Sequence, residues 1–126
     1  MYPRELKYTD THEWLKVENG TAKVGITYYA QEQLGDIVFV ELPQVEDEFP
    51  KGEPFGVVES VKAVSDLHMP VEGKVINVNE QLEETPELLN SDPYGEGWII
   101  EIEISSSKQL EELNEASEYE EKLETE

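Results

Sequence analysis

The sequence predicts a mainly β domain with short helical inserts and a C-terminal helix. Alternating apolar and polar runs flank Asn19-Gly20, a dipeptide that tolerates positive φ and is a strong hairpin signal. Further short runs are rich in β-branched residues and stop at proline or glycine. The acidic tail instead places apolar residues at helical spacing. A chain of 126 residues can close one modest core, so we predict a single domain over residues 1–126.

Seven runs are predicted to be strands, because each is short, apolar-rich and bounded by turn signals. They cover residues 14–18, 21–26, 37–42, 55–61, 64–67, 74–78 and 98–104. The segment 43–54 contains three prolines, one glycine and four acids, so we expect a loop there. Residues 91–97 contain a proline and two glycines and predict another loop.

Two short helices are predicted between the strands. Thr27 can cap a helix over residues 28–34, and Gly35 can end it in a left-handed conformation. Thr85 precedes Pro86, which is the arrangement of a cap residue before a proline at the first helical position.

The tail is predicted to form one helix over about residues 106–124. Ser106 is followed three residues later by Gln109, which is the pattern of a capping box. Five apolar residues then recur at spacings of three or four, namely Leu110, Leu113, Ala116, Tyr119 and Leu123. This spacing marks one helix face, which we expect to pack on the sheets.

The composition excludes several kinds of chemistry. The chain has no cysteine, so its own side chains form no disulfide, zinc–thiolate site, iron–sulfur cluster or catalytic thiol. No apolar run can span a bilayer and the start resembles no secretory signal, so we expect a cytoplasmic protein with no membrane contact. His12 and His68 lack metal-ligand spacing and residues 46–48 lack a calcium-loop pattern, so we expect no metal site.

The charge is strongly negative and unevenly spread. The chain has 9 basic and 30 acidic residues, a net charge of −21, which argues against nucleic acid as a partner. Residues 50–74 carry 4 acids and 3 lysines, whereas residues 75–126 carry 16 acids and 2 lysines. The acidity explains solubility, and it also suits a carrier that docks on basic surfaces. The near-neutral middle segment is where we look for a site.

Within that segment, residues 58–67 read almost the same in both directions about Lys62-Ala63. A turn at these two residues would pair Glu59 with Asp66 across a hairpin, and such like-charge pairs are mildly destabilising. From the residues alone, an ordinary exposed turn lysine explains the pattern equally well.

A series of short stretches carries a family resemblance. Around the lysine they are Glu59-Ser60-Val61-Lys62-Ala63, Ser65-Asp66, Pro70-Val71 and Gly73. Elsewhere they are Thr11-His12-Glu13-Trp14, Val24-Gly25-Ile26-Thr27, Ala30-Gln31, residues 34–43, Asn90, Asp92-Pro93-Tyr94-Gly95 and Gly97-Trp98. In this order they resemble the glycine cleavage system H proteins over about residues 7–123. Biotin carriers, which usually flank the lysine with methionines, and the shorter lipoyl domains of 2-oxoacid dehydrogenases fit less well.

The resemblance implies a lipoyl/biotinyl-type barrel-sandwich hybrid of two small antiparallel sheets, with a lipoyl hairpin over about residues 55–70. It implies a non-catalytic carrier whose lipoate is amide-linked to Lys62 by a lipoate ligase or octanoyltransferase. The carrier would take an aminomethyl group from glycine decarboxylase (P-protein) to aminomethyltransferase (T-protein), and dihydrolipoamide dehydrogenase (L-protein) would reoxidise it. A paralogue that donates or relays lipoate, and an adaptor that only docks, remain alternatives.

Three acids are further candidate site residues. Glu59 is expected to help the modifying enzyme recognise the hairpin, because an acid opposite another acid is hard to explain by stability. Glu13 and Asp66 match family positions and are expected to line a cleft for the cationic aminomethyl arm, although ordinary surface acids remain an alternative. His68 stands where the family often has an aromatic residue, and we expect a packing or surface variant.

Overall fold

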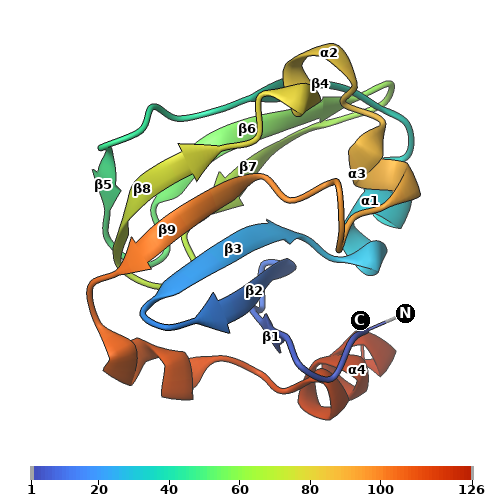
Figure 1. The fold of residues 1–126 in the computed structure, drawn as a ribbon. Coiled ribbons are helices and arrows are strands. Elements are labelled where there is room, and N and C mark those ends of the chain that lie inside the picture. The colour runs from blue at the N-terminus through green and yellow to red at the C-terminus, as the bar shows by residue number, and fades with distance from the viewer. Residues whose placement is uncertain (1, 126) are drawn as a thin grey trace.

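The computed structural model describes residues 2–125, and within that range nine strands form two antiparallel sheets (Figure 1). The larger sheet has the order β1-β2-β3-β9-β8-β5 and the smaller has the order β4-β6-β7. The strands are β1 (Lys7–Tyr8), β2 (Glu13–Glu18), β3 (Thr21–Ile26), β4 (Ile37–Glu41), β5 (Glu48–Phe49), β6 (Pro54–Ser60), β7 (Val64–His68), β8 (Gly73–Val78) and β9 (Ile100–Ile104). The helices are α1 (Tyr28–Leu34), α2 (Gln81–Glu84), α3 (Leu88–Ser91), the 3-10 helix η1 (Ser107–Glu112) and α4 (Ala116–Glu124).

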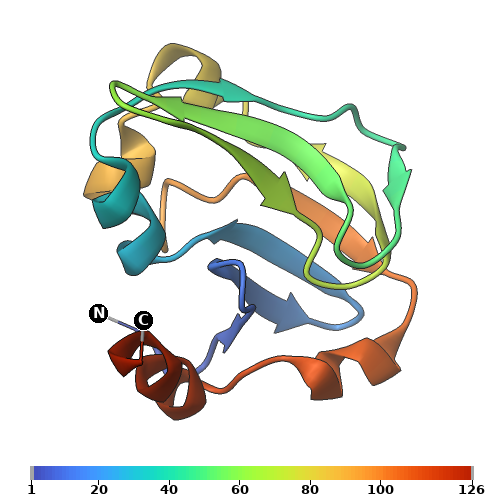
Figure 2. The ribbon, with the colours of Figure 1, turned by 180° about the vertical axis from the view of Figure 1, so that it is seen from behind.

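The main hydrophobic core lies between the two sheets, and both supply residues to it. The larger sheet contributes side chains that include Leu15, Val24, Val75, Ile100 and Ile102, and the smaller contributes Ile37, Val40, Val58 and Leu67. Each of these residues is at most 3% exposed. Seen from behind, the smaller sheet forms the layer that faces the viewer (Figure 2). The mainly β fold with two antiparallel sheets is therefore confirmed. No helix among residues 2–125 is long and apolar enough to cross a membrane.

Helix α1 follows the predicted local chemistry. The Thr27 side chain accepts a hydrogen bond from the Ala30 N–H, as an N-cap residue does. Gly35 ends the helix at a φ of 80°, where a residue with a Cβ would be strained, and its N–H donates to the Gln31 carbonyl. Thr27 therefore fixes the start of α1 and Gly35 its end, and the connection from Gly35 to β4 lies beside the hairpin described below.

The predicted continuous helix over residues 106–124 is wrong in its first half. Residues 107–112 form η1 instead, and Ser106 makes no side-chain cap. The chain then extends, because Asn114 and Tyr8 exchange two backbone hydrogen bonds of 2.8 and 2.9 Å. Helix α4 starts after this bridge with its own capping box, formed by Glu115 and Glu118. A pairing between residues far apart in sequence thus overrode the local helical spacing.

The predicted apolar face of the tail is divided between two clusters. Leu113 packs in the core between the sheets, whereas Ala116 and Tyr119 pack in a second cluster with Tyr8 and Trp14. The Tyr8 and Tyr119 rings stack with centroids 4.9 Å apart. Helix α4 therefore covers the N-terminal strands on the side away from the smaller sheet (Figure 1).

Three elements were not predicted. Strands β1 and β5 have two residues each and helix α2 has four. Elements of this length show no periodicity, so only the tertiary pairing of β1 with β2 and of β5 with β8 reveals the strands.

Candidate functional site

The candidate site is the hairpin formed by β6 and β7, and its turn differs from the predicted one. Glu59 pairs with Val64 and Val57 pairs with Asp66. The tip is therefore Val61-Lys62, and the predicted turn at Lys62-Ala63 is wrong by one residue. It follows that Glu59 and Asp66 do not face each other, so the like-charge argument for Glu59 no longer holds.

Ser60 explains where the turn forms. Its N–H donates to the Ala63 carbonyl at 2.8 Å, and its Oγ accepts from the N–H groups of Lys62 and Ala63 at 3.2 and 3.0 Å. Hydroxyl side chains close turns in this way. The tip is also held from outside, because the Val61 N–H donates to the Asp36 carbonyl at 3.0 Å. The hairpin tip is thus braced against the connection between α1 and β4.

Lys62 is exposed at this tip. Its Cε lies 3.5 Å from the position that a Cβ on Gly35 would occupy, so the aliphatic part of the side chain passes over the glycine that ends α1. Among residues 2–125, Lys62 takes part in no ion pair. Its amine is therefore accessible to a modifying group.

Asn90 supports the same region, and the sequence analysis did not assign it this role. Its Nδ2 donates to the Gly35 carbonyl at 2.9 Å and to Gln31 Oε1 at 3.0 Å. Its Oδ1 accepts from the Ile37 N–H at 2.9 Å. One amide side chain on α3 therefore fixes both ends of the connection on which the hairpin tip rests. Its presence among the family-like residues was the only sequence signal.

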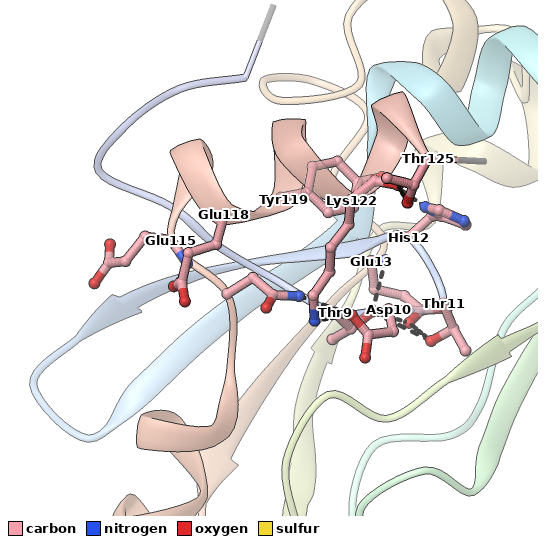
Figure 3. A network of polar contacts seen from close by, with 11 residues as sticks. Thr9, Asp10, Thr11, His12, Glu13, Glu115, Glu118, Tyr119, Lys122 and Thr125 are labelled. Atoms are coloured by element: carbon pink, nitrogen blue, oxygen red, sulfur yellow. Dashed lines mark hydrogen bonds and ion pairs between the residues drawn. The ribbon is translucent and has the colours of Figure 1, made fainter.

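Glu13 lies at the start of β2 and is only 2% exposed (Figure 3). Its Oε1 accepts hydrogen bonds from the Thr9 and Thr11 hydroxyls. Its Oε2 accepts from the His68 N–H at 3.1 Å, which ties the N-terminal strand to the end of β7. The start of β2 therefore lies against the C-terminal end of β7. Asp66, two residues before His68, is exposed on the same face of β7.

His68 is partly buried, which fits the expected packing variant. Its Nδ1 is buried, lies 3.8 Å from Glu13 Oε2, and has no hydrogen-bond partner among residues 2–125. The rest of the side chain is partly open, with 32% exposed. The Glu13 carboxylate and the His68 Nδ1 therefore face each other, and one hydrogen-bond donor placed between them could bind to both.

Burial raises the pKa of Glu13 above its ordinary value. Hydrogen bonds from Thr11, Thr9 and the His68 backbone act in the opposite direction, because they favour the carboxylate. Burial has the largest effect of these causes, so the folded protein holds a proton on Glu13 more tightly than the unfolded chain does.

This shift predicts how stability depends on pH. Between the ordinary Glu pKa of 4.5 and the higher folded value, the native state binds more protons than the unfolded state, so the contribution of Glu13 to stability falls as pH rises. Urea unfolding from pH 4 to 8 should show that the free energy of unfolding of Glu13→Gln rises relative to that of the native chain as pH rises. Glu18→Gln, an exposed position on the same strand, should run parallel to the native chain. Parallel curves for both variants would contradict the prediction.

The loop before β2 is held by a second polar contact set that the sequence analysis missed (Figure 3). His12 has a φ of 72°, and its Nδ1 lies 2.7 Å from the Tyr119 hydroxyl. The same hydroxyl lies 2.8 Å from Thr27 Oγ1. Helix α4 thus joins the turn that carries Glu13 to the cap of α1.

Comparisons with known proteins agree with the fold. The model of the glycine cleavage H-protein family matches residues 6–126. The chain belongs to the glycine cleavage H-protein family. A relative from Staphylococcus epidermidis, a glycine cleavage system H protein, is 55% identical over 121 residues, which are 96% of each chain. One of the same name from Carboxydothermus hydrogenoformans is 56% identical over 124 residues, 98% of this chain and 95% of the relative.

A solved structure extends the agreement to three dimensions. The crystal structure of a glycine cleavage system H protein from Mycobacterium marinum has a TM-score of 0.89 with this chain at 39% sequence identity. The match covers 97% of this chain and 98% of the other. The family resemblance drawn from the short stretches is therefore confirmed over nearly the whole chain, and with it the lipoyl-type barrel-sandwich fold.

Proposed function

We propose that this chain is the lipoyl carrier of a glycine cleavage system and that lipoate is amide-linked to Lys62. The observation that carries the proposal is an exposed lysine amine, without an ion pair among residues 2–125, at the tip of a braced hairpin. Full-length family membership supports the same assignment. When bound, lipoate supplies the thiol chemistry that a chain without cysteine lacks.

The residues of the chain itself position this group and catalyse nothing. Ser60 and Asp36 hold the tip by hydrogen bonds, so the attachment point is rigid while the arm beyond it is free to move. An arm of about eleven bonds from the lysine Cα to the dithiolane ring reaches roughly 14 Å, since each bond of ~1.5 Å advances an extended chain by about 1.25 Å. The proposed partners are the P-protein, the T-protein and the L-protein, which would each reach this arm in the cytoplasm, together with a lipoate ligase or octanoyltransferase.

Acylation of the unmodified chain tests the proposal. Incubation with lipoate, ATP and a lipoate ligase should add one lipoyl mass, and peptide mapping should locate it on Lys62. Lys74, on β8 of the larger sheet, is the control lysine, because its amine pairs with Glu46 at 3.1 Å. If the chain gains no lipoyl mass, or gains it elsewhere, the proposal is wrong.

Glu59 is proposed to assist recognition by the modifying enzyme. It is half-buried on β6, beside Phe39 on one side and Val64 on the other. A single rim charge acts mainly on the association rate, so Glu59→Gln should lower kcat/KM for lipoylation about threefold to tenfold, more at low salt. Glu53→Gln, an exposed acid just before the same strand, should have no effect. Equal rates for Glu59→Gln and the native chain would remove the role.

Glu13 and Asp66 are proposed to hold the cationic cargo at the end of the arm. Asp66 is exposed on the same strand face as His68 and would meet the cargo directly, whereas Glu13 is buried beneath it against the His68 backbone. A charge-assisted contact contributes about 1–3 kcal/mol. Glu13→Gln or Asp66→Asn should therefore speed spontaneous release of ammonia and formaldehyde from the loaded carrier by about fivefold or more. Glu41→Gln is the exposed control. Native release rates in both variants would contradict this role.

A further inference from the structure

Four large apolar side chains are exposed around the lysine-bearing tip. Val38 is 54% exposed, Phe39 49%, Val61 70% and Val64 67%. We call these four residues the hairpin patch. Among residues 2–125, the other large apolar residues in this class are Val17 and Val45, at 37% and 47%. Grouped apolar exposure of this kind marks an interaction site more often than scattered exposure does.

A β-bulge turns Phe39 outward. In a regular strand, side chains alternate, so Phe39 would share the buried face with Ile37. The pairing of β4 with β6 instead shifts register between these two residues. Ile37 and Val40 are each 3% exposed, whereas Val38 and Phe39 between them both face solvent. Bulges re-aim side chains in this way and often lie beside functional sites.

The register joins the patch to the hairpin. Phe39 pairs with Glu59, and Glu59 pairs with Val64, so these three side chains form one row across the outer face of the smaller sheet. Val61 lies at the tip itself, next to Lys62. This end of the sheet lies on the side of α1 and α3 (Figures 1 and 2). The patch therefore lies next to the tip that carries Lys62.

The charged side chains around the patch are mostly acidic. Asp36, Glu41 and Asp66 are exposed, and Glu59 lies within the row. Lys62 is the one cation of the hairpin 54–68, and acylation removes its charge. A complementary partner would present an apolar pocket with a basic rim.

We infer that the hairpin patch is the docking surface of the lipoate ligase that acylates Lys62, with Phe39 as its apolar anchor. The inference rests on the proposed function. An enzyme that modifies Lys62 must bring its reactive centre to Nζ, so it must contact the residues around the lysine Cα. An enzyme that acts on the far end of the arm is free to dock roughly 14 Å away. The patch is therefore assigned to the attachment step.

In the enzyme, lipoate and ATP form the acyl-adenylate and release pyrophosphate. Lys62 Nζ then forms an amide bond to the carboxyl carbon of the adenylate, the bond from that carbon to the adenylate oxygen breaks, and AMP leaves. The amine loses its protons to solvent, and no oxidant or reductant is needed.

The test measures kcat/KM of a lipoate ligase on variants of the full chain. Phe39→Ser should lower kcat/KM about tenfold or more, mainly through KM, because a buried aromatic anchor dominates binding. Phe39→Leu should recover most of the rate. Val45→Ser and Val17→Ser, which remove exposed apolar side chains outside the patch, should stay within about twofold of the native chain.

Chemical acetylation and the glycine–bicarbonate exchange reaction distinguish loss of ligase docking from other causes. Acetylation of Lys62 by acetic anhydride should proceed equally in Phe39→Ser and the native chain, because the hairpin and its amine are intact. Native kcat/KM for Phe39→Ser overturns the inference. A loss seen only in glycine–bicarbonate exchange, with chains lipoylated beforehand, also overturns it and assigns the patch to the decarboxylase. Failure of the native chain to be acylated at Lys62 overturns the proposed function instead.

Discussion

Lys62→Arg is expected to abolish lipoylation and glycine–bicarbonate exchange while leaving the free energy of unfolding within about 0.5 kcal/mol of the native value. Arginine keeps the positive charge, but its guanidinium stays protonated at every pH of interest and is not acylated. The side chain is exposed and forms no ion pair among residues 2–125, so the fold does not depend on it. This is the largest functional effect we expect from one substitution.

Intact-mass spectra and the exchange reaction with the P-protein measure the two losses separately. Lys74→Arg is the matched control and should gain one lipoyl mass and support exchange. A lipoyl mass on Lys62→Arg would contradict the assignment. A native chain that is lipoylated at Lys62 yet supports no exchange would instead identify a carrier that relays lipoate.

Gly25→Ala is expected to lower the free energy of unfolding by about 3 kcal/mol, the largest effect on stability that we predict. Gly25 pairs with Trp14 across β2 and β3. A Cβ at Gly25 would lie 2.6 Å from Trp14 Cε2 and Nε1. The ring cannot move aside easily, because it is 1% exposed and its Nε1–H donates to the Pro93 carbonyl at 2.9 Å.

A double-mutant cycle tests this cause. Trp14→Leu removes the ring that the new methyl group would meet, so Gly25→Ala should cost much less in that background. The coupling between the two positions should be at least about 1 kcal/mol, as for residues in direct contact. Additive effects in urea unfolding would contradict the steric explanation. Both residues belong to the family-like stretches, and this contact gives them a packing role.

Local chemistry made several elements predictable. Asn19 and Gly20 have φ values of 48° and 82°, as the hairpin signal requires. Thr27 caps α1 through a hydroxyl only three residues from its partner. The hairpin over about residues 55–70 appears as β6 and β7, since its strands are short and adjacent in the chain. Each of these features depends on neighbours within a few residues.

The candidate site was predictable only in part. Lys62 was singled out by its motif, and it lies at a hairpin tip as expected. The turn around it was misplaced by one residue, because a hydrogen bond from the Ala63 N–H to the Ser60 hydroxyl and one from the Val61 N–H to the Asp36 carbonyl decide where the chain reverses. Neither hydrogen bond can be predicted from the palindromic pattern of residues 58–67.

By itself, the sequence determined the mainly β architecture, the lysine at the hairpin and the absence of a protein thiol, because these follow from short-range patterns and composition. Only the tertiary structure decided the split between η1 and α4, the bulge that exposes Phe39, and the burial of Glu13 against His68. Each of these depends on a partner strand or side chain distant in sequence. Such long-range contacts override local propensity wherever they bury a polar group or complete a backbone pairing that local structure would leave open.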